Sequence, residues 1–325
     1  MKIAFHVNEL NVRGSEGATF KYAHFNEKLL NNKSYILAGP LNTGKGDHRG
    51  TLYEHPLAQE YFGSRFPVYR YNSWAEAEAF LKGEEIDMLY MQKAGGNDGL
   101  FSKDIKTCVH SVFQICDPHG DVYAYISEWL SKTMDGGKHP FVPYIVTLPD
   151  VSENLREELG IPPDAVVLGR TGGPETFDLE FVHNAIKQVL NERDDIYFLF
   201  LYTYEFMEEH SRVKHFPATM DKEWISKFIN TCDGMIHARG QGESFGLSVA
   251  EFSIKNKPII TWNGSGDRAH INMLGDKGLY YGDQKEAKDI MLNFTPQPEK
   301  NWDAYSEHFS PENSMNKFKE VFING

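Results

Sequence analysis

The sequence predicts an α/β protein made of two parallel-sheet domains in tandem. Short apolar segments of strand length alternate with longer segments of helix length along the chain, a pattern typical of βαβ units. The pattern restarts after residues 148–152, whose composition is that of a linker. A chain of 325 residues is long enough for two domains that each bury a core. We therefore expect one domain over residues 1–150 and a second over residues 151–325.

The first half contains the elements of one complete sheet. Apolar runs predict strands over residues 3–7, 35–38, 68–71, 86–91, 107–113 and 122–126, with a last strand over 144–148. A helix follows the turn at residues 11–17 and carries Phe20, Ala23 and Leu30, and further helices cover 74–81 and about 127–134. Residues 43–50 read as a polar loop, and its Thr-Gly-Lys-Gly segment lacks the frame of a phosphate-binding P-loop.

The second half repeats the plan. Strands are expected over residues 166–169, 196–202, 233–238, 259–262 and 279–281, and helices over 177–191, about 247–255 and 284–292, with a further segment over 222–231. Asn256, Lys257 and Pro258 end the helix before the strand at 259–262, because proline cannot continue a helix. A helical run over 315–322 closes the chain.

Composition excludes several classes of function. The chain has 33 Lys and Arg against 46 Asp and Glu, a net charge of −13, so non-specific nucleic-acid binding is not expected. The three cysteines lack metal-ligand spacing, which favours a reducing compartment. Residues 1–5 run directly into a strand, and no apolar run is long enough to span a bilayer. We expect a cytoplasmic protein without a signal peptide, and peripheral membrane association stays open.

The most informative segment is ESFGLSVAE, in which Glu243 and Glu251 stand eight residues apart. A buried strand precedes it and a helix begins inside it, so the helix N-terminus faces the carboxyl ends of the parallel strands. Free N–H groups there attract a negatively charged ligand. A carboxylate in the loop and another on the helix are placed to accept hydrogen bonds from hydroxyl groups. A nucleotide sugar carries both phosphates and hydroxyls, and the segment is suited to bind one. The alternative is that both glutamates are solvated.

This segment resembles the Glu-x7-Glu motif of retaining GT-B glycosyltransferases, group 1 (family 4). The resemblance implies two Rossmann-like domains facing each other across a cleft, with the last helix packing back on the first domain. It implies that Glu243 touches the donor sugar and Glu251 holds the ribose. The amides of Phe245, Gly246 and Leu247 would serve the sugar and the phosphates.

Two more segments carry the resemblance. Arg13, Gly14 and Ser15 lie between the first strand and the first helix, where the family has a glycine-rich donor loop. A loop with two glycines is also an ordinary turn, and Arg13 is either a phosphate ligand or a solvated side chain. Arg170 and Gly172 follow the first strand of the second domain, where the family has an Arg bound to the donor diphosphate. The alternative for Arg170 is a surface salt bridge.

The chain departs from the family at position 175. The family usually has a Lys five residues after the Arg, and this chain has Glu175. The second positive charge must come from elsewhere. Arg239, at the end of the strand before Glu243, is the first candidate to replace it, followed by Lys214.

His110 and His119 compete for the histidine that the family sets near the anomeric carbon of the donor. His110 belongs to a strand that is deep in the domain, and His119 to a turn-rich loop. The next strand starts directly after His119, which argues that this loop lies at the wrong end of the sheet. We favour His119 slightly and keep both. His237, on a buried strand, is interpreted as a core residue.

By this resemblance the chain is a retaining hexosyltransferase that moves a sugar from a nucleoside-diphosphate donor to a saccharide or other hydroxyl acceptor. The second domain would hold the nucleotide and the first the acceptor. No metal or other cofactor is expected, since no metal-ligand spacing occurs and Asp194 and Asp195 read as a solvated turn. A sugar-nucleotide epimerase, a phosphorylase and a non-catalytic sugar- or nucleotide-binding protein are the alternatives. A phosphorylase would need a pyridoxal lysine, for which there is no motif.

Overall fold

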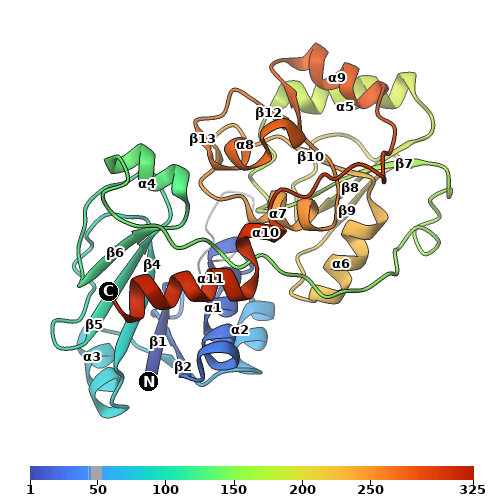
Figure 1. Ribbon diagram of the computed structural model, residues 1–325. Coiled ribbons are helices and arrows are strands. Elements are labelled where there is room, and N and C mark those ends of the chain that lie inside the picture. Colours follow the sequence, from blue (N-terminus) through green and yellow to red (C-terminus); the bar gives the residue numbers. More distant parts are fainter. Residues whose placement is uncertain (43, 45–52) are drawn as a thin grey trace. The chain divides into compact units, whose positions relative to one another are not determined.

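The chain forms two compact units in the computed structural model, which describes residues 1–42, 44 and 53–325 (Figure 1). The first unit comprises Met1–Ile145 and His308–Gly325, and the second comprises Val146–Glu307. The division thus falls just before the segment 148–152 whose composition indicated a linker. The polar loop expected over residues 43–50 lies, except for Gly44, outside the described residues.

The first unit is built on a six-stranded parallel sheet with the strand order β3-β2-β1-β4-β5-β6. Its central strands are buried on both faces, which explains why they are continuous apolar runs rather than alternating ones. The strands are β1 (Lys2–Val7), β2 (Lys33–Ala38), β3 (Val68–Arg70), β4 (Met88–Lys93), β5 (Lys106–Ser111) and β6 (Val122–Tyr125). The helices are α1 (Gly14–Leu30), α2 (Pro56–Gly63), α3 (Trp74–Gly83), α4 (Glu128–Asp135), α11 (Pro311–Phe318) and the π-helical turn η2 (Lys319–Ile323).

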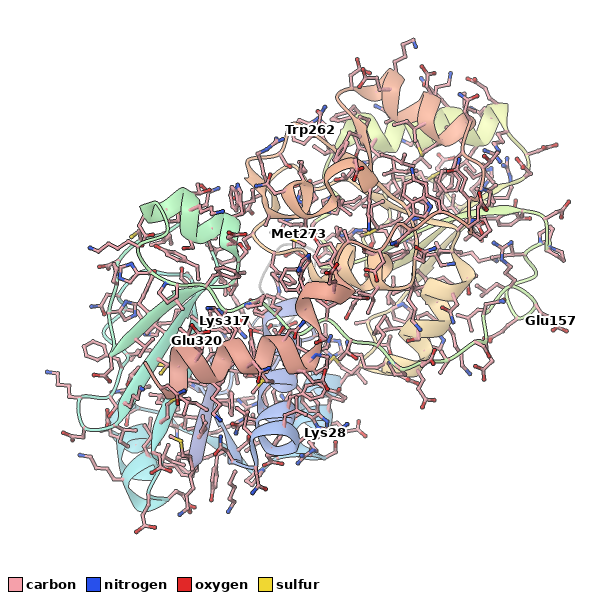
Figure 2. The ribbon with its side chains drawn as sticks, viewed as in Figure 1. Lys28, Glu157, Trp262, Met273, Lys317 and Glu320 are labelled. Atoms are coloured by element: carbon pink, nitrogen blue, oxygen red, sulfur yellow. The ribbon has the colours of Figure 1, made fainter. Side chains whose placement is uncertain are left out.

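The C-terminal helix α11 completes the core of this first unit and runs alongside α1 in Figure 1. The ring of Phe318 lies 5.2 Å from that of Tyr22 and 5.3 Å from that of Tyr90. On the outer side, Lys317 and Glu320, both labelled in Figure 2, form an ion pair of 3.0 Å. The amphipathic pattern near the end of the chain therefore buries its aromatic face in the first unit.

The second unit repeats the plan with a six-stranded parallel sheet in the order β14-β12-β10-β7-β8-β9. The strands are β7 (Val166–Thr171), β8 (Ile196–Leu201), β9 (Val213–Phe216), β10 (Gly234–His237), β12 (Ile259–Trp262) and β14 (Gly278–Tyr281). The helices are α5 (Glu180–Glu192), α6 (Lys222–Thr231), α7 (Leu247–Ile254), α8 (Ala269–Leu274) and α9 (Gln284–Leu292), with a 3₁₀ turn, η1, over Gly275–Lys277. The short helix α10 (Ser306–Phe309) spans the boundary between the two units in the sequence. A small two-stranded sheet pairs β11 (Gly242–Glu243) with β13 (Asp267–Arg268). The prediction of two parallel-sheet α/β domains is confirmed.

One predicted strand is absent. Residues 144–148 form no regular strand, although Tyr144 and Ile145 are buried as an apolar run should be. Side chains rather than a neighbouring strand donate to the first two carbonyl groups of this stretch. Ser314 Oγ donates to the carbonyl of Tyr144, and Lys21 Nζ donates to that of Ile145. Because these donors come from α11 and α1, burial did not require sheet pairing.

Other elements carried no clear apolar pattern. The helix α2, the edge strand β9 and the short helix α8 were not predicted. The strand expected over residues 107–113 ends at Ser111. The edge strand β9 is only half-buried along its length, which is why its sequence lacks the apolar signature.

Candidate functional site

Glu243 is the centre of a polar cluster at the carboxyl ends of the strands of the second unit. It lies on β11, and its side chain is 18% exposed. His237 Nε2 lies 3.2 Å from Oε1, and Arg239 Nη1 lies 3.0 Å from Oε2. Burial by itself raises the pKa of this carboxyl. The charge of Arg239 and the hydrogen bond from His237 outweigh burial and lower the pKa to about 2. Glu243 is therefore a carboxylate with both oxygens held.

The turn after Glu243 requires a glycine. Gly246 has φ of 90°, in the left-handed region, and it is the N-cap residue of α7. A Cβ at this position would lie 3.2 Å from Cβ of Glu243 and 3.3 Å from Cβ of His270. As the N-cap residue, Gly246 has no side chain that could cap the first N–H groups of α7. The backbone thus leaves the N-terminus of the helix beside the carboxylate, which is an arrangement suited to an anionic ligand.

The turn also fixes where the other residues of the motif lie. Phe245 is 3% exposed and its ring lies 6.2 Å from that of Tyr305. Leu247 is the first residue of α7, and Glu251 follows one turn later on the same helix, half-buried. The two glutamates of the motif therefore come from two adjoining elements, β11 and α7.

Arg170 is a buried cation at the end of β7. Its residue is 2% exposed, and its guanidinium donates to Thr203 Oγ1, to Thr176 Oγ1 and to the carbonyl of Gly173. Burial lowers its pKa to about 10, while the charge of Glu243 acts in the opposite direction. No carboxylate among the described residues forms an ion pair with it, so Arg170 is not part of a surface salt bridge. A buried cation that is held only by neutral groups favours an anion.

Gly172 allows the chain to pass close to this guanidinium. Its φ is 154°, and a Cβ there would lie 2.7 Å from Nη2 of Arg170. The hydroxyl of Thr171 is buried and has no hydrogen-bond partner within the described chain. One buried hydroxyl in this turn therefore makes no hydrogen bond to the described residues.

Arg239 faces Glu243 rather than open solvent. It makes the ion pair of 3.0 Å to the carboxylate, and Nη2 lies 3.4 Å from Oε1 of Gln241. The residue expected to replace the missing Lys at position 175 is thus a partner of the carboxylate. Lys214, the second candidate, lies on the edge strand β9.

The two candidate histidines of the first unit lie in different places. His119 lies beside the start of β5, since its neighbour Asp121 donates through its backbone N–H to the carbonyl of Thr107 across 2.8 Å. This is the amino end of the sheet, opposite to the end where parallel sheets bind ligands, as the objection to His119 anticipated. The structure therefore does not favour His119.

His110 is completely buried within β5. Its Nε2 lies 2.9 Å from the carbonyl of Val142, and its Nδ1 lies 2.6 Å from the hydroxyl of Tyr90. Burial lowers its pKa to about 3, so the ring is neutral. Because a carbonyl only accepts, Nε2 carries the proton and donates to Val142, and Tyr90 donates to Nδ1. Both ring nitrogens are thus used inside the first unit.

The expected glycine-rich loop is helical. Helix α1 begins at Gly14, and the backbone N–H of Gly17 donates to the carbonyl of Arg13 across 3.1 Å. Ser15 donates through Oγ to Glu16, and neither glycine has a positive φ. Residues 14–17 therefore form the first turn of α1, with Arg13 as its N-cap residue, rather than a free loop. Composition predicted a turn, but an intrahelical hydrogen bond forms.

Sequence reasoning missed a row of side chains behind Glu243. His237 Nδ1 lies 2.9 Å from Oγ1 of Thr261, and that oxygen lies 3.2 Å from Nε2 of His270. His237 and Thr261 are register partners on the neighbouring strands β10 and β12. His237 is buried, as expected of a core residue, but its ring is bonded to the carboxylate. Only the pairing of the strands reveals this row.

Within residues 1–42, 44 and 53–325, no group of three or more His, Cys, Asp or Glu side chains is placed to hold a metal ion. In the same residues no helix has both the length and the apolar character needed to cross a membrane. Asp195 pairs with Arg193 across 2.6 Å at the turn before β8.

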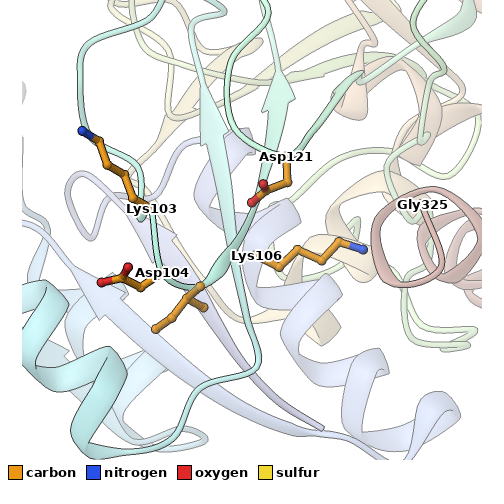
Figure 3. A pocket seen from close by; sticks show the side chains of 6 residues that line it. Lys103, Asp104, Lys106, Asp121 and Gly325 are labelled. Atoms are coloured by element: carbon orange, nitrogen blue, oxygen red, sulfur yellow. The ribbon is translucent and has the colours of Figure 1, made fainter.

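A hollow of about 410 Å³ lies on the first unit, lined by Lys103, Asp104, Ile105, Lys106, Asp121 and Gly325 (Figure 3). Two of its charged groups bind other parts of the protein. Asp121 accepts the N–H of Thr107, and Lys106 donates to the carbonyl of Ile323. None of the predicted site residues lines it.

Comparison with known proteins identifies the fold. No protein-family model and no curated protein matches the chain. Solved structures do match: a glycosyltransferase from Rickettsia africae has a TM-score of 0.69 at 14% identity, covering 99% of this chain and 98% of that one. Anabaena HepE in complex with UDP and glucose has a TM-score of 0.69 at 13% identity, covering 100% of both chains. A putative UDP-N-acetylglucosamine 2-epimerase from Listeria monocytogenes has a TM-score of 0.62 at 11% identity, covering 100% of this chain and 97% of that one. With two parallel-sheet units and a match over its full length, this chain has the GT-B fold.

Proposed function

We propose that this chain is a retaining glycosyltransferase that transfers a hexose from a nucleoside-diphosphate donor to a hydroxyl acceptor. The observation that carries the proposal is the buried guanidinium of Arg170, which has only neutral partners and is electrostatically coupled to the carboxylate of Glu243. A diphosphate would pair with this cation, and sugar hydroxyls would donate hydrogen bonds to the carboxylate. The similarity in fold to HepE, solved with UDP and glucose, supports this assignment.

The chemistry needs few protein groups. Arg170 and the N-terminus of α7, whose N-cap residue is a glycine, would stabilise the charge that develops on the leaving diphosphate. Glu243, ionised at neutral pH because its pKa is about 2, would accept hydrogen bonds from the donor sugar and fix the reacting carbon. Glu251, one turn into α7, would hold the ribose.

In this reaction the acceptor attacks from the face that the diphosphate leaves. The departing phosphate oxygen takes the proton of the acceptor hydroxyl, so no carboxylate nucleophile is needed. We assign acceptor binding to the first unit. We further propose that the reaction is independent of divalent metal, because Arg170 and the helix end supply the positive charge. Unchanged transfer in EDTA is the expected result, and transfer that EDTA abolishes and manganese restores would refute it.

A sugar-nucleotide epimerase is the second candidate, favoured by the similarity to the Listeria protein. One experiment separates the two. The chain is incubated with a panel of nucleotide sugars, with and without saccharide acceptors, and the products are resolved by chromatography. A transferase releases nucleoside diphosphate faster when the right acceptor is present. An epimerase converts the donor without acceptor, and a binding protein leaves every donor intact.

A further inference from the structure

We propose that His237, Thr261 and His270 form a hydrogen-bonded relay that fixes the carboxylate of Glu243, with His237 as a positioning residue for the sugar-binding group. The inference rests on the proposed function, which gives Glu243 a sugar to hold. It adds to the site three residues that lie outside the Glu243–Glu251 motif.

The relay spans three elements. His237 ends β10, Thr261 lies on β12, and His270 lies on α8. Their residues are 4%, 0% and 0% exposed, and the two imidazole rings lie 4.9 Å apart. Three polar side chains buried in a row between a strand pair and a helix are costly unless their hydrogen bonds are all made.

Hydrogen-bond chemistry gives the row a single direction when both rings are neutral. Glu243 is ionised and only accepts, so Nε2 of His237 carries a proton and donates to Oε1. Nδ1 of His237 then accepts from the hydroxyl of Thr261, which leaves the oxygen of Thr261 to accept from Nε2–H of His270. The proton positions of all three residues therefore follow from the charge on Glu243.

The row ends at Nδ1 of His270. Nδ1 of His270 is buried and has no hydrogen-bond partner within the described residues. In the derived tautomer this atom is an acceptor, so a water or a ligand hydroxyl is the group that would complete it. The charged groups that act on His270 are Glu243, Arg268 and Arg239, together with the neighbouring ring of His237.

The relay anchors the carboxylate of Glu243, which the short strand around it cannot do alone. Glu243 lies on a strand of only two residues, paired with β13. His237, by contrast, is anchored on both sides, since Tyr281 Oη donates to its carbonyl across 2.7 Å and Thr261 orients its ring. Without His237, Arg239 alone would hold the carboxylate, which could then rotate about that one contact.

The kinetic test uses two substitutions that remove hydrogen bonds without adding charge. His237→Leu should lower kcat by about tenfold to hundredfold, as expected for a lost hydrogen bond to a charged group. Its affinity for the bare nucleoside diphosphate should stay unchanged, because His237 contacts the sugar-binding carboxylate. The acid limb of the kcat profile should move to higher pH, since Glu243 loses a donor. Arg239, Arg170 and His270 are the other groups that set the ionisation of Glu243.

Thr261 provides the rescue. Thr261→Val keeps the shape and removes the hydroxyl, and should lower kcat by about threefold to tenfold, as for a neutral hydrogen bond. Thr261→Ser restores the hydroxyl and should recover most of that loss. A purely structural role would instead lower the melting temperature and the nucleotide affinity together. Wild-type kcat and an unmoved acid limb in His237→Leu would overturn the relay.

A second measurement does not depend on activity. Nitrogen-15 NMR of the imidazole rings in the intact wild-type chain should show His237 and His270 both protonated at Nε2 at neutral pH. In Thr261→Val the signals of His270 should shift. A proton on Nδ1 of either ring would overturn the relay. A wild-type chain that binds no nucleotide sugar would refute the proposed function alone, and the NMR result would still decide the relay.

Discussion

Arg239 donates from Nη1 to Oε2 of Glu243 across 3.0 Å, so the cation nearest to the motif is already paired with the motif's first carboxylate. Arg170, in contrast, is surrounded by hydroxyl and carbonyl groups. The two arginines therefore act differently in the site. Arg170 forms hydrogen bonds only with neutral groups, although the carboxylates of Glu243, Glu175 and Asp178 act on it electrostatically. Arg239 is paired directly with Glu243.

This difference predicts unequal effects on phosphate binding. Arg170→Ala should weaken binding of a nucleoside diphosphate by about 1.5–3 kcal/mol, the range for a hydrogen bond to a charged group. Arg239→Ala should weaken it less, because its guanidinium is used by Glu243. Isothermal titration of both variants measures the difference. Nucleoside without phosphates is the control ligand and should bind equally to all three proteins. Equal losses in both variants would return Arg239 to the role of the missing Lys.

The two glutamates of the motif should separate affinity from turnover. Glu251→Ala should weaken binding of the bare nucleoside diphosphate, because a ribose contact is the same in the ground and transition states. Glu243→Ala should mainly lower kcat, because contacts to the sugar position the reacting carbon. Calorimetry and steady-state kinetics on both variants test the division. It fails if both variants lose the same affinity.

The pKa of Glu243 predicts a specific acid sensitivity. Its folded value of about 2 lies below the ordinary value of 4.5. A carboxyl whose pKa is depressed by folding adds stability above its unfolded pKa, and this stability is lost as the pH falls through the folded pKa. The contribution is about 3 kcal/mol, and it disappears between about pH 4.5 and pH 2. Urea unfolding at several pH values should show a smaller loss over this window in Glu243→Gln than in the wild type. Parallel curves would contradict the low pKa.

The histidine His110 should be structural. His110→Leu leaves the hydroxyl of Tyr90 and the carbonyl of Val142 without their partner inside a closed core. Each unmet buried group costs about 1–3 kcal/mol, so the first unit should lose several kcal/mol of stability. Nucleotide binding by the second unit should be retained where the protein folds. Denaturation curves and calorimetry provide the measurement. Full stability with abolished transfer would instead assign His110 to the reaction.

The elements that could be predicted are those that local sequence determines. The strands β8 and β12 are short apolar runs between turn residues, and Pro258 marks the end of the preceding helix. The placement of Glu243 before the N-terminus of α7 follows in the same way, since Gly246 and the helix lie within a few residues.

The rest depends on contacts between distant segments. His237 and Thr261 meet because β10 pairs with β12 in one register, and His270 reaches them from α8. No pattern of single residues encodes that register. For the same reason residues 144–148 appeared to be a strand, although side chains of α11 and α1 donate to the carbonyls of Tyr144 and Ile145. Composition also could not distinguish a loop at residues 14–17 from the first turn of α1.

Gly246 offers the sharpest test of how the backbone positions the carboxylate. Its φ of 90° is unfavourable for any residue with a Cβ, and the added atom would lie 3.2 Å from Cβ of Glu243. Gly246→Ala should therefore lose about 1–2 kcal/mol of stability from backbone strain. It should also lower kcat, because the strain displaces Glu243 and the start of α7 together.

Gly83, at the end of α3, is the matched control, since no atom lies within 4 Å of a Cβ placed there. Gly83→Ala should leave kcat unchanged and leave stability equal or slightly higher, since alanine is the better helix former. Thermal unfolding and turnover of both variants decide the matter: a Gly246→Ala protein as stable and active as the Gly83→Ala protein would show that this turn does not set the position of Glu243.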